Sequence, residues 1–181
     1  MSSAVGTQHD LIARFEAAAR SAAATVERVP ANASTLASAM GRIATGRMAI
    51  AEPLDLPAEL FAELYRLPGI VTARSKAELA ACDVGITDAF AAVARTGSVC
   101  VTVDHAYSGA ISLLARLHIA VVAADTIVER PAEIFDSNRF GGKGLTRNFC
   151  FITGPSATAD MGPLVRGVHG PHKLHVIILE S

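Results

Sequence analysis

Short apolar runs that alternate with helical patterns constrain this chain more than any other feature. The clearest runs are 118–123 and 174–179, in each of which a histidine stands at the first or second position among aliphatic residues. A strand that is apolar on both sides has to be buried on both faces, as in a largely parallel sheet. The sequence therefore predicts an α/β fold with a mostly parallel sheet and helices on both faces.

The helical patterns are strongest in the first half of the chain. Residues 9–29 are predicted to form one amphipathic helix that ends before Pro30, and a second helix is predicted up to about residue 44. We expect a single domain in which residues 1–45 form N-terminal helices and residues 46–181 form the α/β core. Further helices are predicted over 57–67, 76–81, 110–117 and 129–140, and strands over 48–50, 69–72, 82–87, 118–123, 149–152 and 174–179.

Residues 90–103 fit two structures. Their alanines suit a helix, whereas their apolar residues alternate on either side of Thr96-Gly97, which suits a hairpin. We prefer the hairpin, with its turn at residues 95–98.

Composition excludes several classes of protein. The 181 residues are 51% hydrophobic and 18% charged with a formal net charge of −1, so the chain is globular and has no electrostatic attraction for nucleic acid or anionic membranes. The first eight residues lack the features of a signal peptide, and no apolar run approaches the roughly 20 residues of a membrane span. We expect a cytoplasmic protein that binds neither nucleic acid nor membranes.

The three cysteines form no recognisable pattern. Cys82, Cys100 and Cys150 are widely spaced, and each has apolar neighbours. Neither a disulfide framework nor a metal knuckle has this spacing, so buried reduced thiols are predicted.

The polar segment 153–160, together with 167–171, is the main candidate for a functional site. It is dense in glycine, proline and hydroxyl groups, and it connects two predicted strands. Two further polar segments, 85–88 and 96–98, also follow predicted strands. Because ligands of α/β sheets bind beyond the carboxyl ends of strands, these loops are expected to converge. A helical turn starting at Thr158 would add backbone N–H groups for an anion. The alternative is that Ser156 and Thr158 cap a turn that Asp160 tethers.

The histidines and cationic residues leave alternatives open. His169 suits proton transfer or anion contact, or equally a structural bond across its turn. His169, His172 and His175 are spaced three apart, but on a loop running into a strand they point in different directions, so no metal is predicted. His118 is interpreted as a core histidine, and Gly141-Gly142-Lys143-Gly144 as a surface loop rather than a phosphate cradle.

No familiar catalytic or nucleotide-binding motif is present. The sequence contains no G-x-S-x-G elbow, P-loop or G-x-G-x-x-G fingerprint, so no cofactor is predicted. Arg95 and Arg147 are the best candidates to bind a small carboxylate, because a guanidinium group can do so through two hydrogen bonds.

The polar segments, taken in order, resemble the LUD-domain family, the family of lactate utilisation protein C (LutC/YkgG-like). The resemblance covers roughly residue 70 to the C-terminus, and the last thirty residues are its most specific part. The matching motifs are G-I-T-D (85–88), A-R-T-G-S (94–98), L-H-I-A-V-V (117–122), T-G-P-S-A-T-A-D (153–160), G-V-H-G-P (167–171) and L-H-V-I-I-L (174–179).

The resemblance implies a fold similar to the NagB/RpiA/CoA-transferase group. It also implies a place in a cytoplasmic system that oxidises L-lactate to pyruvate together with iron–sulfur partner proteins. This chain has no cluster-binding cysteine pattern, so electron transfer would belong to those partners. The chain departs from the family pattern in three places: Arg95 stands where an acid is usual, Ala157 where a base is usual, and Gly109-Ala110 near the place of an arginine that commonly precedes the L-H-I strand.

The leading hypothesis is a LutC-like protein that binds a small anionic metabolite in a cleft at strand ends. The alternatives are a non-catalytic assembly subunit with a degenerate site and, by fold analogy, a transferase or isomerase acting on acyl-CoA or sugar phosphates. In the leading hypothesis Asp160 and His169 orient the ligand or transfer protons. The residues predicted to contact the ligand are Thr87, Arg95, Thr96, Gly97, Ser98, Gly154, Ser156, Thr158 and Gly170.

Overall fold

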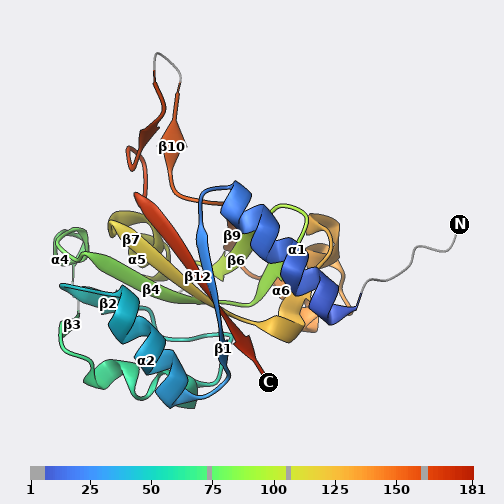
Figure 1. Cartoon of the computed structure of the whole chain (residues 1–181), viewed down its shortest axis with the longest axis horizontal. Coiled ribbons are helices and arrows are strands. Elements are labelled where there is room, and N and C mark those ends of the chain that lie inside the picture. The colour runs from blue at the N-terminus through green and yellow to red at the C-terminus, as the bar shows by residue number, and fades with distance from the viewer. Residues whose placement is uncertain (1–6, 73–74, 105–106, 160–162) are drawn as a thin grey trace, which may run out of the picture.

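The protein is built around a six-stranded parallel sheet (Figure 1). The computed structural model describes residues 7–72, 75–104, 107–159 and 163–181. The order of the strands is β1-β12-β7-β4-β2-β3, and each strand pairs in parallel with its neighbours. Their bounds are β1 Thr25–Pro30, β2 Met48–Ile50, β3 Ile70–Val71, β4 Val84–Ala89, β7 Leu117–Ala123 and β12 Lys173–Glu180.

A second, four-stranded sheet continues from the first. Only Phe90 separates β4 from β5 (Ala91–Val93), which pairs with β6 (Ser98–Thr102) in an antiparallel hairpin, as predicted. β8 (Ile127–Val128) lies parallel to β5, and β9 (Phe149–Ile152) forms the other edge, antiparallel to β6.

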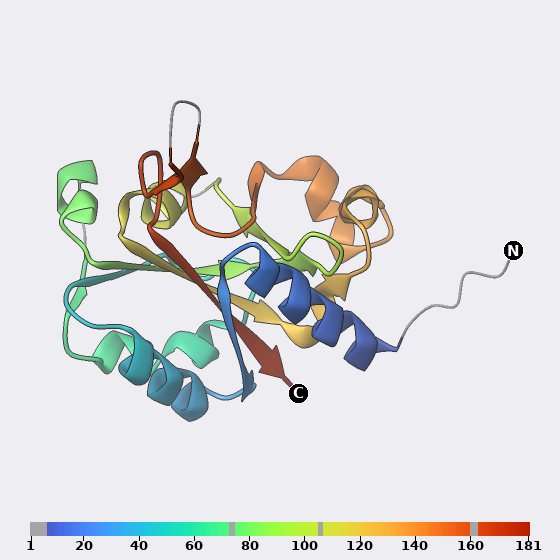
Figure 2. The same ribbon diagram turned by 45° about the horizontal axis from the view of Figure 1, so that its top comes forward.

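Helices cover both faces of the main sheet, which confirms the predicted fold class (Figures 1 and 2). Helix α2 (Ala33–Ile43), helix α3 (Ala58–Phe61) and the 3₁₀ turn η1 (Leu64–Arg66) pack on the face that carries Ile119 and Val121. Helix α1 (Gln8–Ser21) and the second sheet pack on the face that carries Ala120 and Val122. Because strand residues alternate between the faces, an apolar run in β7 supplies both cores.

The shorter elements lie around the second sheet and next to the main sheet. Helices α4 (Lys76–Ala80) and α5 (Ser108–Leu114) pack against β2 and β4. The remaining short elements are the 3₁₀ turns η2 (Ala124–Thr126), η3 (Pro131–Phe135) and η4 (Phe140–Gly142) and the short helix α6 (Lys143–Thr146). None of the helices among the described residues has the length and apolar character needed to cross a membrane.

A two-stranded hairpin projects from the body of the protein (Figures 1 and 2). It consists of β10 (Ala157–Thr158) and β11 (Val165–Arg166), which pair in antiparallel fashion. The prediction that Thr158 starts a helical turn was wrong, because Thr158 pairs with Val165 instead. The anion site expected at that helix start is therefore missing from the described part of this segment.

The single helix predicted over 9–29 was also wrong. Helix α1 ends at Ser21, Ala23 has a φ of 64°, and the chain then enters β1. Residues 25–30 pair in parallel with β12 in the last ten residues of the chain. This contact is distant in sequence, so helical periodicity gives no sign of it, and it ends the helical pattern that the preceding alanines suggest.

Three smaller predictions also needed correction. Within residues 129–140 the structure has the 3₁₀ turn η3 rather than a full helix, and residues 57–67 are divided between α3 and η1. Residues 85–88, predicted as a loop, lie inside β4 and are buried. Side-chain caps fix the starts of two helices: Asn32 accepts from the Thr35 N–H at the start of α2, and Ser75 accepts from the Glu78 N–H at the start of α4.

Candidate functional site

A cavity of about 340 Å³ lies between α5, β9 and the segments that lead into β12. We call it the loop cavity. Its walls are formed by Gly109, Ser112 and Leu113 of α5, by residues 150–152 of β9, by residues 153–156 and 169–171, and by Val103, His118 and Leu174. His118 and Leu174 are each the second residue of a parallel strand, so the cavity lies at the amino end of the main sheet.

Hydrogen bonds hold the two polar segments together at this cavity. The Ser156 backbone N–H donates to the Pro171 carbonyl at 3.0 Å, and the Gly167 N–H donates to the Ser156 carbonyl at 2.9 Å. The His169 N–H donates to Ser156 Oγ at 3.3 Å. These bonds position Ser156 and His169 against one another, although they are thirteen residues apart in the sequence.

His118 is a buried polar residue among those that line this cavity. Its side chain is completely buried, and Nε2 lies 2.9 Å from Thr87 Oγ1 on the neighbouring strand β4. Nδ1 is also buried and has no hydrogen-bond partner among the described residues. An unpaired buried nitrogen costs roughly 1–3 kcal/mol, so a native protein seldom keeps one without a ligand, a water or a function.

Burial also sets the charge of this imidazole. It lowers the pKa of His118 to about 4, so the ring is neutral at pH 7. In a neutral imidazole one nitrogen donates and the other accepts. Thr87 can play either role toward Nε2, so the unpaired Nδ1 carries a donor in one tautomer and an acceptor in the other.

The structure brings together part of the predicted site. Gly154, Ser156, His169 and Gly170 all line the loop cavity, and Thr87 lies directly behind it through its contact with His118. The His169 side chain is exposed, whereas Ser156 is half-buried. Asp160, predicted as catalytic, lies outside the described residues.

Thr96 and Ser98 reach the cavity indirectly. Thr96 Oγ1 lies 2.6 Å from Ser98 Oγ, which in turn lies 2.6 Å from Thr153 Oγ1, and Thr153 lines the cavity. Arg95 is exposed on the same turn and is not among the described residues that line the cavity. Thr158 lies in the stem of the projecting hairpin and is likewise not among them.

Two of the predicted glycines have a structural role next to α1. Gly97 (φ 67°) and Gly154 (φ 67°) both lie in the left-handed region. A Cβ at Gly97 would lie 2.3 Å from the Ala19 nitrogen, and one at Gly154 would lie 2.0 Å from the Ala22 carbonyl oxygen. Glycine is needed at both positions because the chain passes close to the C-terminal end of α1.

The carboxyl end of β4 is closed rather than open to a ligand. Oδ2 of the buried Asp88 accepts from the backbone N–H groups of Leu54, Asp55 and Leu56, at 2.9, 2.6 and 3.0 Å. Burial raises the pKa of Asp88, and these three donors oppose that rise. The predicted polar segment 85–88 therefore anchors the chain's own loop at its carboxyl end.

The Asp55 side chain forms ion pairs with two cationic residues that the sequence analysis considered, Lys143 and Arg147. It is 1% exposed, and its carboxylate accepts from Lys143 at 2.6 Å, Arg147 at 2.8 Å and Thr102 at 3.0 Å. Arg147, a candidate for binding a carboxylate ligand, thus binds a carboxylate of its own chain. Lys143 follows two glycines with positive φ, and the segment serves to place this cation.

The prediction that all three thiols are buried holds for two of them only. Cys82 and Cys100 are buried and free, whereas Cys150 is exposed and lines the loop cavity. Within the described parts of the chain, no group of three histidine, cysteine or acidic side chains could hold a metal ion.

His118 is the residue that the sequence analysis assigned to the core. It is buried as expected, but its second nitrogen is unsatisfied and the residue is among those that line the cavity. A histidine in an otherwise aliphatic strand was the available signal. Periodicity alone does not show whether its nitrogens find partners.

The fold and site define an α/β protein with a parallel sheet and a small-molecule-sized cavity at one end. The sequence model of the LUD domain matches residues 12–179, and the chain belongs to this family. This confirms the resemblance seen in the polar segments.

The curated relatives include proteins called lactate utilization protein C. The protein from Bacillus subtilis (strain 168) is 38% identical over 110 residues, which are 59% of this chain and 45% of that protein. The one from Deinococcus radiodurans is 37% identical over 112 residues, 58% of this chain and 50% of that protein. The matched segments thus span half of each relative's length or less.

A solved structure supports the fold. The crystal structure of a DUF162 family protein from Deinococcus radiodurans superposes with a TM-score of 0.68 and covers 96% of this chain and 99% of that chain. The identity is 24%, so the match is informative about fold alone.

Proposed function

We propose that this protein is a component of a lactate oxidation system and that its loop cavity binds a short 2-hydroxy or 2-oxo carboxylate. Membership of the LUD family and the similarity to lactate utilization protein C support the general role. The site is supported by four of the predicted residues, Gly154, Ser156, His169 and Gly170, which all line one cavity.

The observation that carries the proposal is the unpaired Nδ1 of His118. This nitrogen belongs to a residue that lines the cavity, and a ligand oxygen there would satisfy it. If Nε2–H donates to Thr87, Nδ1 accepts from the hydroxyl group of lactate. If Thr87 donates to Nε2, Nδ1–H donates to the keto oxygen of pyruvate. One histidine can therefore bind both redox states of the same acid.

The carboxylate of the ligand would lie toward the mouth of the cavity. The described residues that line the cavity include no lysine or arginine, so backbone N–H groups of Gly154 and Gly170 and the side chains of Ser156 and His169 would bind it. Oriented N–H groups stabilise an anion without a formal positive charge. In this proposal His169 and Asp160 orient the acid or exchange its protons. Electron transfer belongs to iron–sulfur partner subunits.

Isothermal titration with matched acids tests this assignment. L-lactate and pyruvate should bind, and propionate, which has the same carboxylate but no hydroxyl or keto oxygen, should bind about tenfold more weakly because one buried hydrogen bond is lost.

Two substitutions of His118 test the roles of its two ring nitrogens separately. The amide of glutamine reaches the position of Nε2, so His118→Gln keeps the contact with Thr87 and should lose the discrimination between lactate and propionate. The amide of asparagine reaches the position of Nδ1, so His118→Asn should keep much of that discrimination. Equal binding of lactate by the wild type and His118→Gln, or no binding of either acid, would show that the cavity is not the site.

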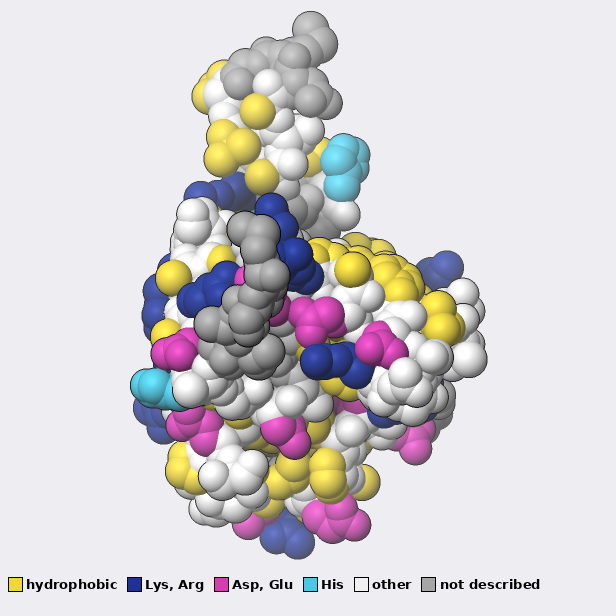
Figure 3. Space-filling view, turned by 90° about the vertical axis from the view of Figure 1, so that its right-hand side faces the viewer, with side chains coloured by type: hydrophobic (Ala, Val, Ile, Leu, Met, Phe, Trp, Pro, Cys, Tyr) yellow, Lys and Arg dark blue, Asp and Glu magenta, His cyan; other side chains and the backbone are white. Residues whose placement is uncertain are grey.

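Assembly through the projecting hairpin is a second candidate function. Leu164 and Val165 of the hairpin region and nearby Val168 are exposed to 58%, 51% and 49%. The projection carries apolar side chains in the space-filling view (Figure 3). In this alternative the hairpin binds a partner subunit and the cavity is inactive. Leu164→Ser with Val165→Ser should then abolish co-purification of the partners, whereas His118→Gln should not change it.

A further inference from the structure

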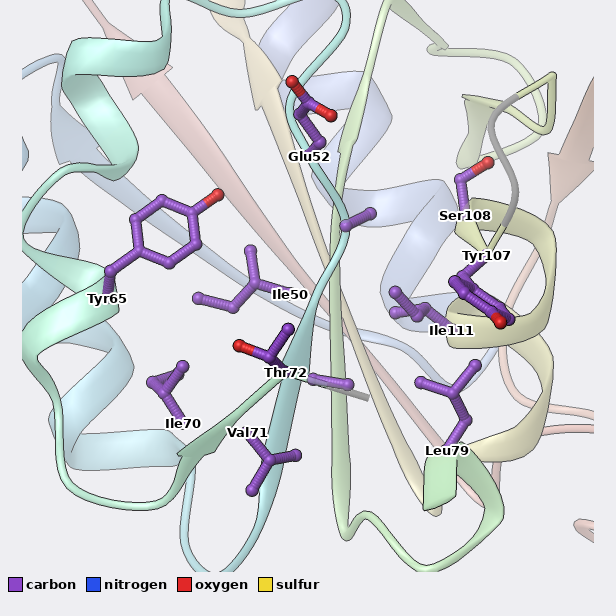
Figure 4. A pocket seen from close by; sticks show the side chains of 12 residues that line it. Ile50, Glu52, Tyr65, Ile70, Val71, Thr72, Leu79, Tyr107, Ser108 and Ile111 are labelled. Atoms are coloured by element: carbon purple, nitrogen blue, oxygen red, sulfur yellow. The ribbon is translucent and has the colours of Figure 1, made fainter. Parts of the chain in front are cut away.

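The edge strands of the two larger sheets differ in how well they are protected against pairing with another strand. A free edge presents backbone N–H and C=O groups, and proteins usually protect it with short strands, charged side chains or proline. The edge strands β3 and β8 have only two residues each, and β1 carries Glu27, Arg28 and Pro30. β3 also borders a hollow of about 400 Å³ whose lining includes the carboxylate of Glu52 (Figure 4). Each of these three edges therefore carries one of the usual protections.

Strand β9, at the remaining edge, is longer and is not protected in these ways. Its sequence is Phe149-Cys150-Phe151-Ile152, which contains neither a charged residue nor a proline. Cys150 and Phe151 are exposed, and the exposed fraction of Phe151 is 40%. An apolar edge strand of this kind is a surface with which another strand can pair.

The backbone of β9 directs two of its residues outward. The Val103 N–H donates to the Asn148 carbonyl at 2.9 Å, and β6 and β9 continue in antiparallel register from this pair. Alternate residues of an antiparallel strand bond to the same neighbour, so Phe149 and Phe151 direct their N–H and C=O groups away from β6. No hydrogen bond joins these four groups to another described part of the chain. They are therefore available to a further strand.

Apolar side chains flank this edge on both faces of the second sheet. The ring centroids of Phe149 and Phe151 are 5.2 Å apart, and Phe135, which is 46% exposed, lies beside both rings. Cys150 points to the other face, because side chains alternate along a strand, and it lines the loop cavity with Leu113, which is 52% exposed. A strand placed alongside β9 would thus meet apolar surface above and below its backbone.

We propose that β9 pairs with β9 of a second copy of this chain, about a two-fold axis at Cys150. In this register Phe149 lies opposite the partner's Phe151, and Phe151 lies opposite the partner's Phe149, so the outward groups form four hydrogen bonds. An axis at Phe149 or at Phe151 would form fewer bonds within β9, since one outward residue would then face a residue outside the strand. The second sheets of the two copies become one continuous sheet, and both copies use the same patch, as in most homodimers.

The residues next to β9 also permit self-pairing. In the same register Asn148 lies opposite the partner's Ile152, and Arg147 lies opposite the partner's Thr153, so no like charges meet. Arg147 is moreover held by Asp55 of its own chain at 2.8 Å. Aromatic pairs at opposite positions stabilise antiparallel strands, whereas like charges there destabilise them. A second copy therefore supplies an uncharged apolar strand that matches β9 in length.

This pairing would add a residue of the second copy to the border of the loop cavity. Cys150, Phe151 and Ile152 line the cavity, and the partner's Cys150 would lie next to Cys150 at its edge. The interface does not depend on which ligand the cavity binds, so a failure of the proposed acid site would leave it unaffected.

Analytical ultracentrifugation of the full chain at increasing concentration should show reversible conversion from one chain mass to two. Phe151→Lys places a charge at the edge and should weaken the dimer by at least about tenfold. Tyr65→Lys is the matched control and should leave the dimer unchanged. Tyr65 is 50% exposed and belongs to η1, which packs on the face of the main sheet opposite to the second sheet. Circular dichroism shows whether both variants are folded.

A cross-link tests the register in the wild-type chain, without a variant. Opposite residues that are not hydrogen-bonded in antiparallel strands have Cα atoms about 4.5 Å apart, which is within the range of a disulfide. Diamide takes up the two electrons and two protons of two thiols, and it should join Cys150 to the partner's Cys150. Cys150→Ser should abolish the cross-linked dimer in non-reducing electrophoresis, since Cys82 and Cys100 are buried. A single-chain mass at every concentration, a dimer that persists in Phe151→Lys, or a dimer that diamide does not cross-link through Cys150 overturns the proposal.

Discussion

Asp88 and His118 are both buried polar residues of the main sheet, on adjacent strands, but they differ in how fully their hydrogen-bonding groups are paired. One Asp88 oxygen has three backbone donors from the loop 54–56. One His118 nitrogen has a single partner, and the other has none among the described residues. A polar group satisfied by its own chain stabilises the fold, whereas one left unsatisfied beside a cavity marks a site for a ligand.

The largest expected effect comes from removing the satisfied group. Asp88→Ala would leave three backbone N–H groups without their acceptor and should lower the free energy of unfolding by about 3 kcal/mol. Asp88→Asn keeps an oxygen in place and should cost less than about 1 kcal/mol. Urea unfolding at pH 7 measures both. If the two variants lose the same stability, the negative charge rather than the acceptor is what holds the loop.

The buried imidazole of His118 should make the stability of the protein depend on pH under acidic conditions. In the unfolded chain His118 binds a proton below about pH 6.5, whereas in the native state burial lowers its pKa to about 4. The unfolded state thus binds more protons between these values, and stability falls as pH falls through this window. The total loss is roughly 3 kcal/mol, complete below about pH 4.

The same titration in His118→Asn isolates this contribution. The variant lacks the imidazole, so its stability should fall less steeply between pH 6.5 and 4, while other buried groups such as Asp88 and His175 contribute equally to both proteins. Parallel stability curves for the wild type and the variant would mean that His118 is already protonated or solvated in the native state.

Substitutions of two glycines at the loop cavity should distinguish an effect on stability from an effect on ligand binding. Gly154→Ala places a Cβ against the Ala22 carbonyl at positive φ and should cost about 2 kcal/mol of stability. At Gly170 a Cβ would lie 3.2 Å from Ser156 Cβ, so Gly170→Ala should change stability by less than about 1 kcal/mol. It should still weaken binding of the acid, because it narrows the cavity. Thermal unfolding and titration of each variant distinguish these roles. Equal effects of the two substitutions on stability would contradict the assignment.

The sequence predicted what depends on local pattern and missed what depends on distant partners. The polar segments 153–156 and 169–171 were identified from turn chemistry, and they do converge. Strand β1 was missed because its preference for the sheet comes from β12, about 150 residues away. The roles of Asp88 and His118 were missed for the same reason, since their partners lie more than thirty residues away in the chain. Local periodicity shows that a polar residue is buried, but not whether it is satisfied.

The smallest effect concerns the hydroxyl chain from Thr96 through Ser98 to Thr153. Ser98 is 2% exposed and lies 2.6 Å from each neighbouring hydroxyl. Ser98→Ala should cost about 1 kcal/mol, because it removes two hydrogen bonds but leaves both other hydroxyls close to solvent. Ser98→Thr keeps the hydroxyl and serves as the control for its loss. If these three hydroxyl groups only join the β5–β6 turn to the start of the polar loop, binding of the acid will be unchanged in Ser98→Ala. A loss of affinity larger than the loss of stability would instead make Thr153 part of the ligand site and extend that site to the turn predicted from the sequence.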